Sequence, residues 1–337
     1  MGYKESIRMA AKEIGEKEGT FLITGATGLV GSCMIDVLLC ANENYGAKYK
    51  IYAMSRSKER LDERFQNKVF PIIQDVSMPL DTSVAFDYIV HAASNADPRA
   101  YAAKPVETVV VNVLGNKNIL DYCRKHIRTK VLLTSSFEVY GKIEGIDVYT
   151  EDMSGTIDFQ LLRNGYPESK RCAEILLRSC CSEYGVDGVI ARLCSIYGPT
   201  MQKNDSKAHA QFIRNALKGE DIVLKSEGTQ LRSYCYVVDA VRAVMTILFC
   251  GMSGESYNVS HENSTATIAE VAGMIADIAG THVVYSKPDA VEARGFSVPQ
   301  NCVLDNGKLK ALGWRGKFDL SDGLAETIEM LKGEGYV

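Results

Sequence analysis

Residues 20–31 read Thr20-Phe21-Leu22-Ile23-Thr24-Gly25-Ala26-Thr27-Gly28-Leu29-Val30-Gly31 and join a short apolar run to three glycines. An apolar run of this length that ends in glycines is typical of a buried parallel strand. Glycine has no Cβ, so it permits a sharp turn and a close approach of the backbone to a bound group. The helical pattern that follows, from about Leu29 to Cys40, presents free N–H groups and a positive dipole end to an anion. The stretch therefore predicts a strand, a phosphate-binding turn and a helix, and the alternative is a tight turn without a ligand.

Further apolar runs predict more strands of the same sheet, at residues 50–55, 70–74, 88–91, 130–135 and 188–193. Helical patterns separate most of these runs, and the longest cover residues 105–126 and 166–184. Strands that alternate with helices in this way predict an α/β fold with a doubly wound parallel sheet of the Rossmann type.

The texture of the sequence changes after Tyr197-Gly198-Pro199, where polar loops alternate with short helices and strands. We interpret this part as a smaller α/β domain that binds the substrate. A helical stretch near 234–249 is expected to return to the first domain, and an amphipathic helix over 4–17 precedes that domain. The predicted division is residues 1–197 with 233–260 for the dinucleotide-binding domain (1–18 being a helical extension), and 198–232 with 261–337 for the smaller domain.

The composition is that of an ordinary globular protein, with 46% hydrophobic and 24% charged residues among 337. The formal net charge is −4, and the Lys and Arg residues are scattered, which argues against a nucleic-acid partner. No apolar run reaches membrane-spanning length. The 10 cysteines include no Cys-x-x-Cys pair, and most lie in apolar segments, which favours reduced, buried thiols over disulfides or a metal site. We therefore expect a cytoplasmic protein that binds neither metal nor membrane.

The end of the second predicted strand is where a dinucleotide-binding sheet contacts the adenosine ribose. Proteins that bind NAD usually place an acidic residue there, whereas this chain has Ser55-Arg56-Ser57. Arg56 can neutralise a 2′-phosphate, so NADP is an alternative to NAD, and Arg56 can also simply stack on adenine. Asp75, just past the third strand, can bond the adenine amino group or cap its own loop.

Tyr166 and Lys170 are four residues apart on a predicted helix and therefore share one face, one turn apart. The ammonium of Lys170 is expected to lower the pKa of Tyr166 from its usual value near ~10, which makes the tyrosine a general base. Ser136 follows the fifth strand, where open parallel sheets place their sites. Its hydroxyl can bond the reacting group, although an ordinary capping serine is the alternative. A Tyr-x-x-x-Lys pattern alone usually marks a solvated helix face. The presence of Ser136 after the fifth strand is what makes the pattern indicate a catalytic site.

With these residues together, the sequence resembles the extended short-chain dehydrogenase/reductase family of nucleotide-sugar epimerases, dehydratases and decarboxylases. The resemblance covers about residues 20–332. It implies that Ser136, Tyr166 and Lys170 form a catalytic triad, that the substrate is a nucleotide-diphosphate sugar and that the protein is a homodimer paired through residues 105–126 and 166–184. It rests on residues 24–31, His91-Ala92-Ala93-Ser94, Asn112-Val113-Leu114-Gly115, 136–141, 166–170, Ala191-Arg192-Leu193, Tyr197-Gly198-Pro199, 232–239 and Leu312-Gly313-Trp314.

The resemblance also implies two sets of binding residues. The implied contacts to NAD or NADP are Gly25, Thr27, Gly28, Leu29, Val30, Gly31, Ser55, Arg56, Asp75, Val76, Ala92, Ala93, Ser94, Asn112, Tyr166, Lys170 and Leu193. The implied contacts to the substrate are Ser94, Arg163, Ser195, Arg232 and Arg294. Of these, Arg232 is implied to bind the nucleotide phosphates.

Glu138 bears on the choice of reaction within this family. Dehydratases of the family typically carry an Asp-Glu pair at this point, and here the Asp position is Phe137, which cannot transfer a proton. Epimerases usually carry a small neutral residue in place of Glu138. The UDP-glucuronate decarboxylase branch looks most similar, from residues 93–101, Arg163 and the run 166–174, and Glu138 is its candidate for later proton movement. Departures from that branch are Phe137, Thr200 in place of an arginine and Ser195 in place of the usual asparagine.

Four alternatives remain open from the sequence. Three are a 4-epimerase, a 4,6-dehydratase and an NADP-dependent nucleotide-sugar reductase. The fourth is a non-catalytic dinucleotide-sensing protein, against which the complete Ser–Tyr–Lys set argues, because a sensor has no need of a tyrosine base.

Overall fold

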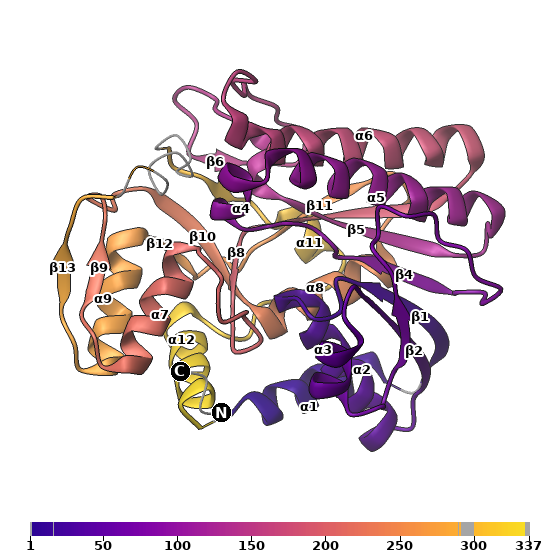
Figure 1. The fold of residues 1–337 in the computed structure, drawn as a ribbon, viewed down its shortest axis with the longest axis horizontal. Coiled ribbons are helices and arrows are strands. Elements are labelled where there is room, and N and C mark those ends of the chain that lie inside the picture. The colour runs from indigo at the N-terminus through magenta and orange to yellow at the C-terminus, as the bar shows by residue number, and fades with distance from the viewer. Residues whose placement is uncertain (1, 16, 289, 291–299, 334–337) are drawn as a thin grey trace.

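The structure is a computed structural model of the chain and describes residues 2–15, 17–288, 290 and 300–333. Its largest element is a parallel sheet with the strand order β11-β7-β5-β4-β1-β2-β3 (Figure 1). All of its strand pairs are parallel, so the predicted fold class is confirmed. The strands are β1 Glu18–Thr24, β2 Lys48–Ser55, β3 Phe70–Ile73, β4 Tyr88–His91, β5 Lys130–Ser136, β7 Asp187–Leu193 and β11 Ser256–Val259. The six strands expected from apolar runs are all present, and β11 is an addition to them.

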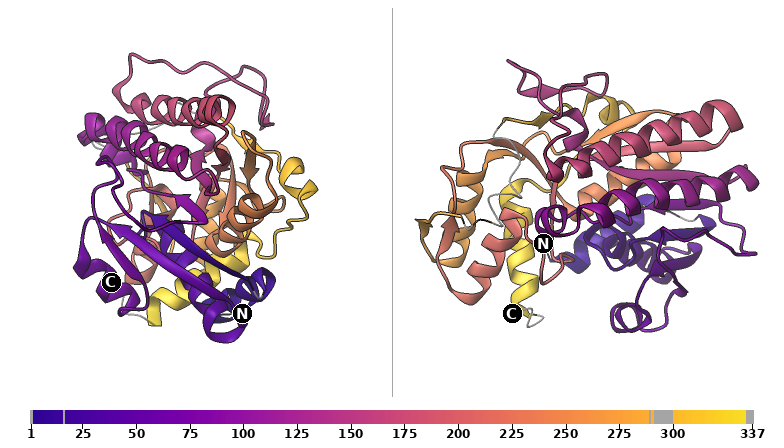
Figure 2. Two further views of the ribbon diagram at one scale, coloured as in Figure 1. Left: turned by 90° about the vertical axis from the view of Figure 1, so that its right-hand side faces the viewer. Right: turned by 45° about the horizontal axis from the view of Figure 1, so that its top comes forward.

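Helices cover both faces of this sheet, because its central strands are apolar on both sides. Along β1, Phe21 and Ile23 pack into one buried cluster and Leu22 into the other, as the two-residue period of a strand requires. Helices α5 and α6 run side by side over one face, and α2 and α8 cover the other (Figures 1 and 2). The bounds of these and the remaining helix of this layer are α2 Leu29–Asn44, α3 Lys58–Phe65, α5 Pro105–Lys125, α6 Gly165–Tyr184 and α8 Val237–Cys250.

Helix α1 (Tyr3–Ile14) docks against α2, α8 and α12 (Leu320–Gly333), so the first and last helices of the chain pack together. Its buried stripe includes the four predicted residues Ile7, Ala10, Ala11 and Ile14. The contact with α12 is polar as well, because the hydroxyl of Ser6 donates to the Glu326 carboxylate at 2.9 Å. The N-terminal extension is therefore packed as part of the protein core.

The rest of the chain forms small sheets and helices beside the large sheet (Figure 1). A three-stranded sheet has the order β12-β10-β8, and two-stranded sheets pair β13 with β9 and β14 with β6. The predicted boundary at 197/198 falls at the end of β8. The elements are α4 Pro98–Ala103, η1 Phe137–Tyr140, β6 Val148–Tyr149, η2 Leu162–Asn164, β8 Ser195–Tyr197, α7 Ala208–Lys218, β9 Ile222–Leu224, β10 Leu231–Tyr236, β12 Thr265–Thr267, α9 Ile268–Ala279, β13 Val283–Tyr285, β14 Val303–Leu304 and α11 Gly307–Ala311.

A buried ion pair ties α6 to the sheet next to the carboxyl end of β5. The Arg192 guanidinium on β7 lies 2.8 Å from the Glu174 carboxylate on α6, and both side chains are at least nine-tenths buried. Glu174 also accepts a hydrogen bond from the Ser135 hydroxyl at 2.6 Å, and Arg192 donates to the Tyr140 hydroxyl at 3.0 Å. These contacts fix the end of β5, from which Ser136 projects.

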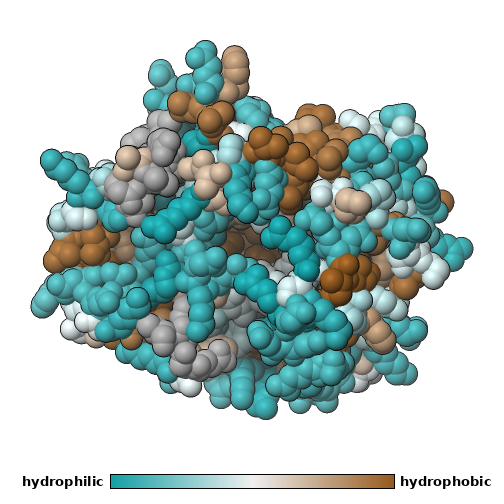
Figure 3. Space-filling view, viewed as in Figure 1, coloured by the Kyte–Doolittle hydropathy of each residue, from teal (hydrophilic) through white to brown (hydrophobic). Residues whose placement is uncertain are grey.

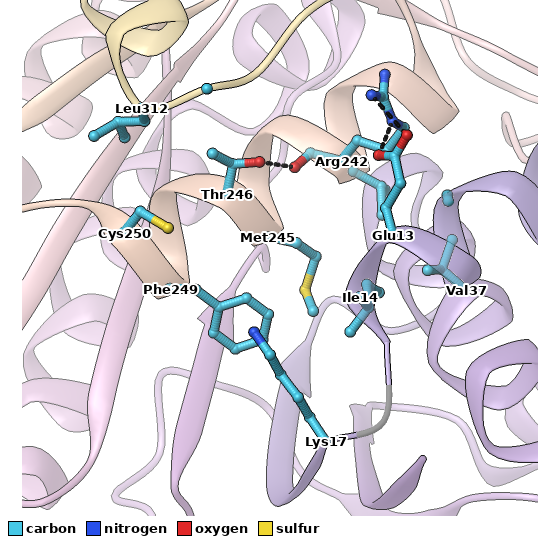
Figure 4. A pocket seen from close by; sticks show the side chains of 13 residues that line it. Glu13, Ile14, Lys17, Val37, Arg242, Met245, Thr246, Phe249, Cys250 and Leu312 are labelled. Carbon is cyan, nitrogen blue, oxygen red and sulfur yellow. Dashed lines mark hydrogen bonds and ion pairs between the residues drawn. The ribbon is translucent and has the colours of Figure 1, made fainter. Parts of the chain in front are cut away.

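A small surface pocket lies between α1 and α8 (Figure 4). Apolar side chains such as Ile14 and Met245 line it, and the Lys17 ammonium lies 4.1 Å from the centre of the Phe249 ring at its edge. Arg242 pairs with Glu13 at 2.7 Å on its other side. None of the predicted site residues lines this pocket, so it is separate from the candidate active site.

All ten cysteines are free, and seven of them are buried. Within the described ranges, no helix is both long enough and apolar enough to cross a membrane. The same ranges contain no group of His, Cys, Asp and Glu side chains that could hold a metal ion.

Candidate active site

The glycine turn between β1 and α2 leaves no room for side chains. Gly25 has a φ of 66°, and a Cβ on it would lie 2.7 Å from the carbonyl oxygen of Ala92. A Cβ on Gly31 would lie 2.3 Å from the carbonyl oxygen of Gly25. Helix α2 begins after Gly28 without a side-chain cap, so its first turn keeps N–H groups for an anion. This cradle fits the pyrophosphate of a dinucleotide.

Thr24 holds the glycine turn against the loop that follows β4. Its hydroxyl oxygen accepts hydrogen bonds from the backbone N–H groups of Ala92 and Ala93, each at 3.1 Å. The same oxygen lies 2.8 Å from Nδ1 of His91. The carboxyl ends of β1 and β4 therefore meet where the predicted cofactor residues lie.

Replacing Gly31 with Ala is expected to displace this turn. Overpacking of this kind costs about 1–3 kcal/mol, so the affinity for NAD should fall about ten- to a hundredfold in calorimetric titration. Gly273→Ala is the matched control, because Gly273 is also helical but a Cβ on it would meet nothing within 4 Å. That control should bind NAD as the wild type does, and equal affinities for both variants would contradict the role of the turn.

His91 gives the site a dependence on pH. Burial, and then the nearby Lys170 ammonium, lowers the pKa of His91 to about 3. A histidine in the unfolded chain titrates near ~6.5. As the pH falls below that value, the unfolded chain therefore binds a proton at His91, whereas the folded protein does not. The neutral ring therefore contributes stability above about pH 6.5, and this contribution is lost as the pH falls towards 3.

Between pH 7 and 5 we expect His91 to account for about 2 kcal/mol of lost unfolding free energy. Urea unfolding at the two pH values measures this loss in the wild type and in His91→Gln, where it should be smaller by that amount. His282→Gln is the control, because His282 is exposed and should leave the difference unchanged. An equal loss in the wild type and in His91→Gln would show that this histidine is not the cause.

Arg56 lies at the expected adenosine end of the site, where two carboxylates surround it. Its guanidinium is 3.2 Å from Glu107 and 3.8 Å from Asp75. Asp75 also accepts hydrogen bonds from the backbone and the hydroxyl of Ser77, which are the contacts of a loop-capping aspartate. Ser55 accepts a hydrogen bond from the backbone of Ser57, and the buried Val76 is next to Gly115 of α5.

Ser94 and Asn112, two predicted cofactor residues, form a hydrogen-bond chain to α6. The Ser94 hydroxyl donates to the Asn112 side chain at 2.7 Å, and Asn112 donates to the Ser169 hydroxyl at 2.9 Å. Ser169 in turn donates to the carbonyl oxygen of Tyr166 at 2.8 Å. The chain ties the loop after β4 to the first turn of the helix that carries the predicted base.

The structure brings Ser136, Tyr166 and Lys170 together at the carboxyl end of β5. All three are buried, and the Ser136 hydroxyl interacts with the Tyr166 phenol. The Lys170 ammonium lies 6.0 Å from the centre of the Tyr166 ring and donates to the carbonyl oxygen of Thr134 at 2.8 Å. Ser136 also caps η1 by accepting the N–H of Glu138 at 3.2 Å. Its two predicted roles are compatible, because capping uses only the oxygen and leaves the hydroxyl hydrogen to donate.

The expected lowering of the pKa of Tyr166 is wrong for this structure. Burial, and then the negative charge of Glu138, raises the pKa of Tyr166 well above its ordinary value, and the Ser136 and Tyr101 hydroxyl groups oppose that rise. Burial also lowers the pKa of Lys170 to about 8. The ammonium is directed to a backbone carbonyl, so it does little for the phenol.

Glu138 is held by the predicted substrate residue Arg163. Their carboxylate and guanidinium groups are 2.8 Å apart, and both side chains are largely buried. Beside this pair, the ring of Tyr101 stacks on that of Tyr166 with a centroid distance of 4.4 Å and an interplanar angle of 15°. The sequence did not point to Tyr101 as a site residue, because its approach to Tyr166 arises only from the packing of α4 against η2 and α5.

The other predicted substrate residues occupy different parts of the site. The guanidinium of Arg232 lies 5.2 Å from the centre of the Phe137 ring, so Arg232 borders the catalytic end of β5. Ser195 begins β8 opposite Tyr234, and the predicted cofactor residue Leu193 lies nearby at the end of β7. Arg294 lies outside the described residues.

Two residues that the sequence did not select clamp the glycine turn from the smaller part of the chain. The Thr200 hydroxyl donates to the carbonyl oxygen of Leu29 at 2.7 Å, and the Gln202 side chain donates to that of Thr27 at 3.4 Å. In the sequence, Thr200 stood out only because the UDP-glucuronate decarboxylase branch has an arginine at this position. The hydrogen bond to Leu29 gives this threonine a structural role.

Comparison with known proteins agrees with this geometry. Residues 21–260 match the model of the NAD dependent epimerase/dehydratase family, and the chain belongs to this family, within the extended short-chain dehydrogenases/reductases. Members of this family are enzymes that act on nucleotide sugars and use NAD as their cofactor.

Two curated relatives carry the same activity in their names. UDP-glucuronic acid decarboxylase 6 of Arabidopsis thaliana is 33% identical over 309 residues, covering 90% of this chain and 86% of that protein. UDP-glucuronic acid decarboxylase 1 of Danio rerio is 30% identical over 328 residues, covering 96% of this chain and 75% of that protein.

Solved structures share the fold at lower identity. A dTDP-glucose 4,6-dehydratase from Bacillus anthracis in complex with NAD superposes with a TM-score of 0.78 at 21% identity, covering 94% of this chain and 97% of the other. A UDP-glucose 4-epimerase from Thermotoga maritima also gives 0.78, at 22% identity, covering 94% and 99%. A UDP-glucuronic acid 4-epimerase from Bacillus cereus gives 0.75, at 22% identity, covering 93% and 99%.

Proposed function

We propose that this chain is an NAD-dependent lyase that removes CO2 from a nucleotide-linked uronic acid, with UDP-glucuronate as the first candidate. The observation that carries this proposal is the Glu138–Arg163 ion pair beside Tyr166. It provides a carboxylate at the reacting end of the site, while the preceding residue, Phe137, has no group that can transfer a proton. A 4,6-dehydratase needs an acid and a base at these two positions, so the pair favours decarboxylation, as do the names of the curated relatives.

The chemistry follows from the positions of the side chains. Ser136 orients the hydroxyl at C4 of the sugar, and Tyr166 takes its proton as this carbon becomes a ketone. A bound nicotinamide would accept the hydride from C4 and would later return it. A ketone at C4 is β to the carboxylate on C5, so the bond to the carboxylate breaks and its electron pair moves towards the ketone oxygen. Glu138 is placed to move the proton that C5 then needs.

We propose NAD as the cofactor rather than NADP. Arg56 is the one feature of the sequence that favours NADP. It is balanced by Glu107 and Asp75, so a 2′-phosphate would meet two carboxylates beside its arginine. Calorimetric titration should give tighter binding of NAD than of NADP. Removing one carboxylate, as in Glu107→Gln, should reduce the difference between the affinities for NAD and NADP.

A panel of UDP-, GDP-, CDP- and TDP-sugars that includes the glucuronates tests the reaction by mass spectrometry. Loss of CO2 from UDP-glucuronate is the expected result. Loss of water indicates a dehydratase, a gain of two hydrogens a reductase, and an unchanged mass with altered retention an epimerase. The proposal fails if UDP-glucuronate is untouched while a neutral sugar is isomerised.

We also propose a homodimer that pairs through α5 and α6. Figure 3 shows apolar side chains gathered on the part of the surface where these helices lie. Val106, Val109 and Leu114 of α5 and Ile175 of α6 are among the exposed large apolar residues. Light scattering should give a particle mass of twice the chain mass. The double variant Val106→Glu, Ile175→Glu should give the mass of a single chain. We retain the predicted domain division and a cytoplasmic location, which ten free cysteines support.

A further inference from the structure

The segment that follows β8, residues 198–206, runs from the smaller part of the chain to the predicted dinucleotide site, and we call it the strap. It begins close against α8, since a Cβ on Gly198 would lie 2.3 Å from Cγ1 of Val237. Its middle is anchored by Met201, which is 5% exposed and belongs to the main buried cluster. The strap is therefore packed onto the body of the protein.

One part of the strap holds the phosphate-binding turn. The Thr200 hydroxyl donates to the carbonyl oxygen of Leu29, the first residue of α2, at 2.7 Å. The Gln202 side chain donates to the carbonyl oxygen of Thr27 at 3.4 Å, which is a longer and weaker bond. A peptide unit is rigid, so a bond that holds the Leu29 carbonyl also fixes the N–H of Val30. That N–H is one of the first of α2, which the helix leaves for an anion.

The far end of the strap is bound to the loop that follows β4. Ser206 donates to the Asp97 carboxylate through its backbone N–H and through its hydroxyl, each at 2.7 Å. The same hydroxyl accepts the N–H of Arg99 at 3.2 Å. Asp97 lies three residues after Ser94, a predicted contact of the cofactor. The strap thus joins the two loops that border the predicted dinucleotide site, the β1–α2 turn and the loop after β4.

The proposed reaction requires a cofactor that stays bound. The hydride taken from C4 of the sugar must return to the same molecule after CO2 has left. A dinucleotide that dissociated between these two steps would leave the product as a ketone. Release of a dinucleotide requires the loops around it to move apart, and a segment bound to both loops resists that motion.

We propose that the strap retains the dinucleotide during turnover, and that Thr200 is the positioning residue that fastens the strap to the phosphate-binding turn. The proposal rests on the proposed use of NAD. Thr200 acts through the backbone of the turn, and Ser206 acts from the other end of the strap, through the loop after β4.

Thr200→Val keeps the branched shape of the side chain and removes the hydrogen bond to Leu29. Bound NADH is displaced by an excess of NAD in a stopped-flow instrument, and the loss of its fluorescence gives the rate constant of dissociation. Loss of one hydrogen bond to the turn should raise this rate constant about three- to tenfold. Thr200→Ser keeps the hydroxyl and should release NADH as slowly as the wild type does.

Thr246→Val is the matched control for the loss of a threonine hydroxyl. That hydroxyl also donates to a backbone carbonyl, that of Arg242 at 2.9 Å, but it lies at the separate pocket between α1 and α8 (Figure 4). The dissociation rate of this variant should equal that of the wild type.

Ser206→Ala tests the far end of the strap. It removes the hydroxyl contacts to Asp97 and Arg99 without touching the glycine turn, and it should also release NADH faster than the wild type does. Faster release from Thr200→Val alone would mean that its contact acts on the turn by itself, and it would overturn the strap.

The same measurements separate the strap from the proposed reaction. Unchanged dissociation in both Thr200→Val and Ser206→Ala would overturn the strap, even if the protein removes CO2 from UDP-glucuronate. Faster dissociation in both variants, together with an untouched UDP-glucuronate, would support the strap and count only against the reaction. A wild type that binds no NADH would overturn the strap together with the proposed cofactor.

Discussion

Replacing Tyr166 with Phe is expected to reduce turnover of the nucleotide sugar by about a thousandfold, because the ring remains in place while the group that takes the proton is lost. Positioned acid–base groups typically contribute factors of about 10²–10⁴. The phenol is buried between Ser136, Tyr101 and Glu138, so water has little access to replace it. The stack on Tyr101 should survive, and the affinity for NAD should stay close to that of the wild type.

Single-turnover assays measure this loss best, because they follow the chemical step rather than product release. The absorbance of reduced nicotinamide should appear in the wild type and be strongly delayed in Tyr166→Phe. Tyr184→Phe is the matched control, since Tyr184 ends the same helix but is exposed, and it should turn over normally. A non-catalytic sensor predicts a different result, in which Tyr166→Phe binds dinucleotide and substrate like the wild type and neither protein turns over.

The large sheet could be predicted because its signals are local. Each strand from β1 to β7 in that sheet is an apolar run, and the glycines at 25, 28 and 31 mark one turn within a few residues. The buried stripe of α1 follows from a helical period in the same way. The small strands could not be predicted, because Val148 of β6 pairs with Val303 of β14, far along the chain, and two-residue strands carry no period.

The site was predicted only in part, for a similar reason. The sequence could place Tyr166 and Lys170 on one helix face, but it could not show where the ammonium would point. Burial of the lysine and its bond to Thr134 decided that, and burial of the phenol reversed the expected shift of its pKa. Tyr101 reaches the base only through the packing of α4. Glu138 was found through its place after Ser136, and its pairing with Arg163 was visible only in the structure.

Arg192→Ala is expected to lower the free energy of unfolding by about 3–5 kcal/mol, because it leaves the Glu174 carboxylate buried without its cation. Three contacts between these two side chains are within 3.3 Å, and the arginine also bonds Tyr140 and the backbone of Glu151. Urea unfolding followed by circular dichroism measures the loss. Lys58→Ala, which breaks the exposed Lys58–Asp62 pair, is the control and should hardly change the stability.

A double variant separates the loss of attraction from the cost of an unpaired charge. Arg192→Met with Glu174→Gln removes both charges, keeps the volume and leaves an amide oxygen to accept from Ser135. Because most of the cost arises from the carboxylate left alone, the double variant should regain most of the stability that Arg192→Ala loses. Ser135 adjoins Ser136, so the regained fold should also regain turnover. Equal instability of the single and double variants would mean that the hydrogen bonds of Arg192, rather than its charge, hold the end of β5.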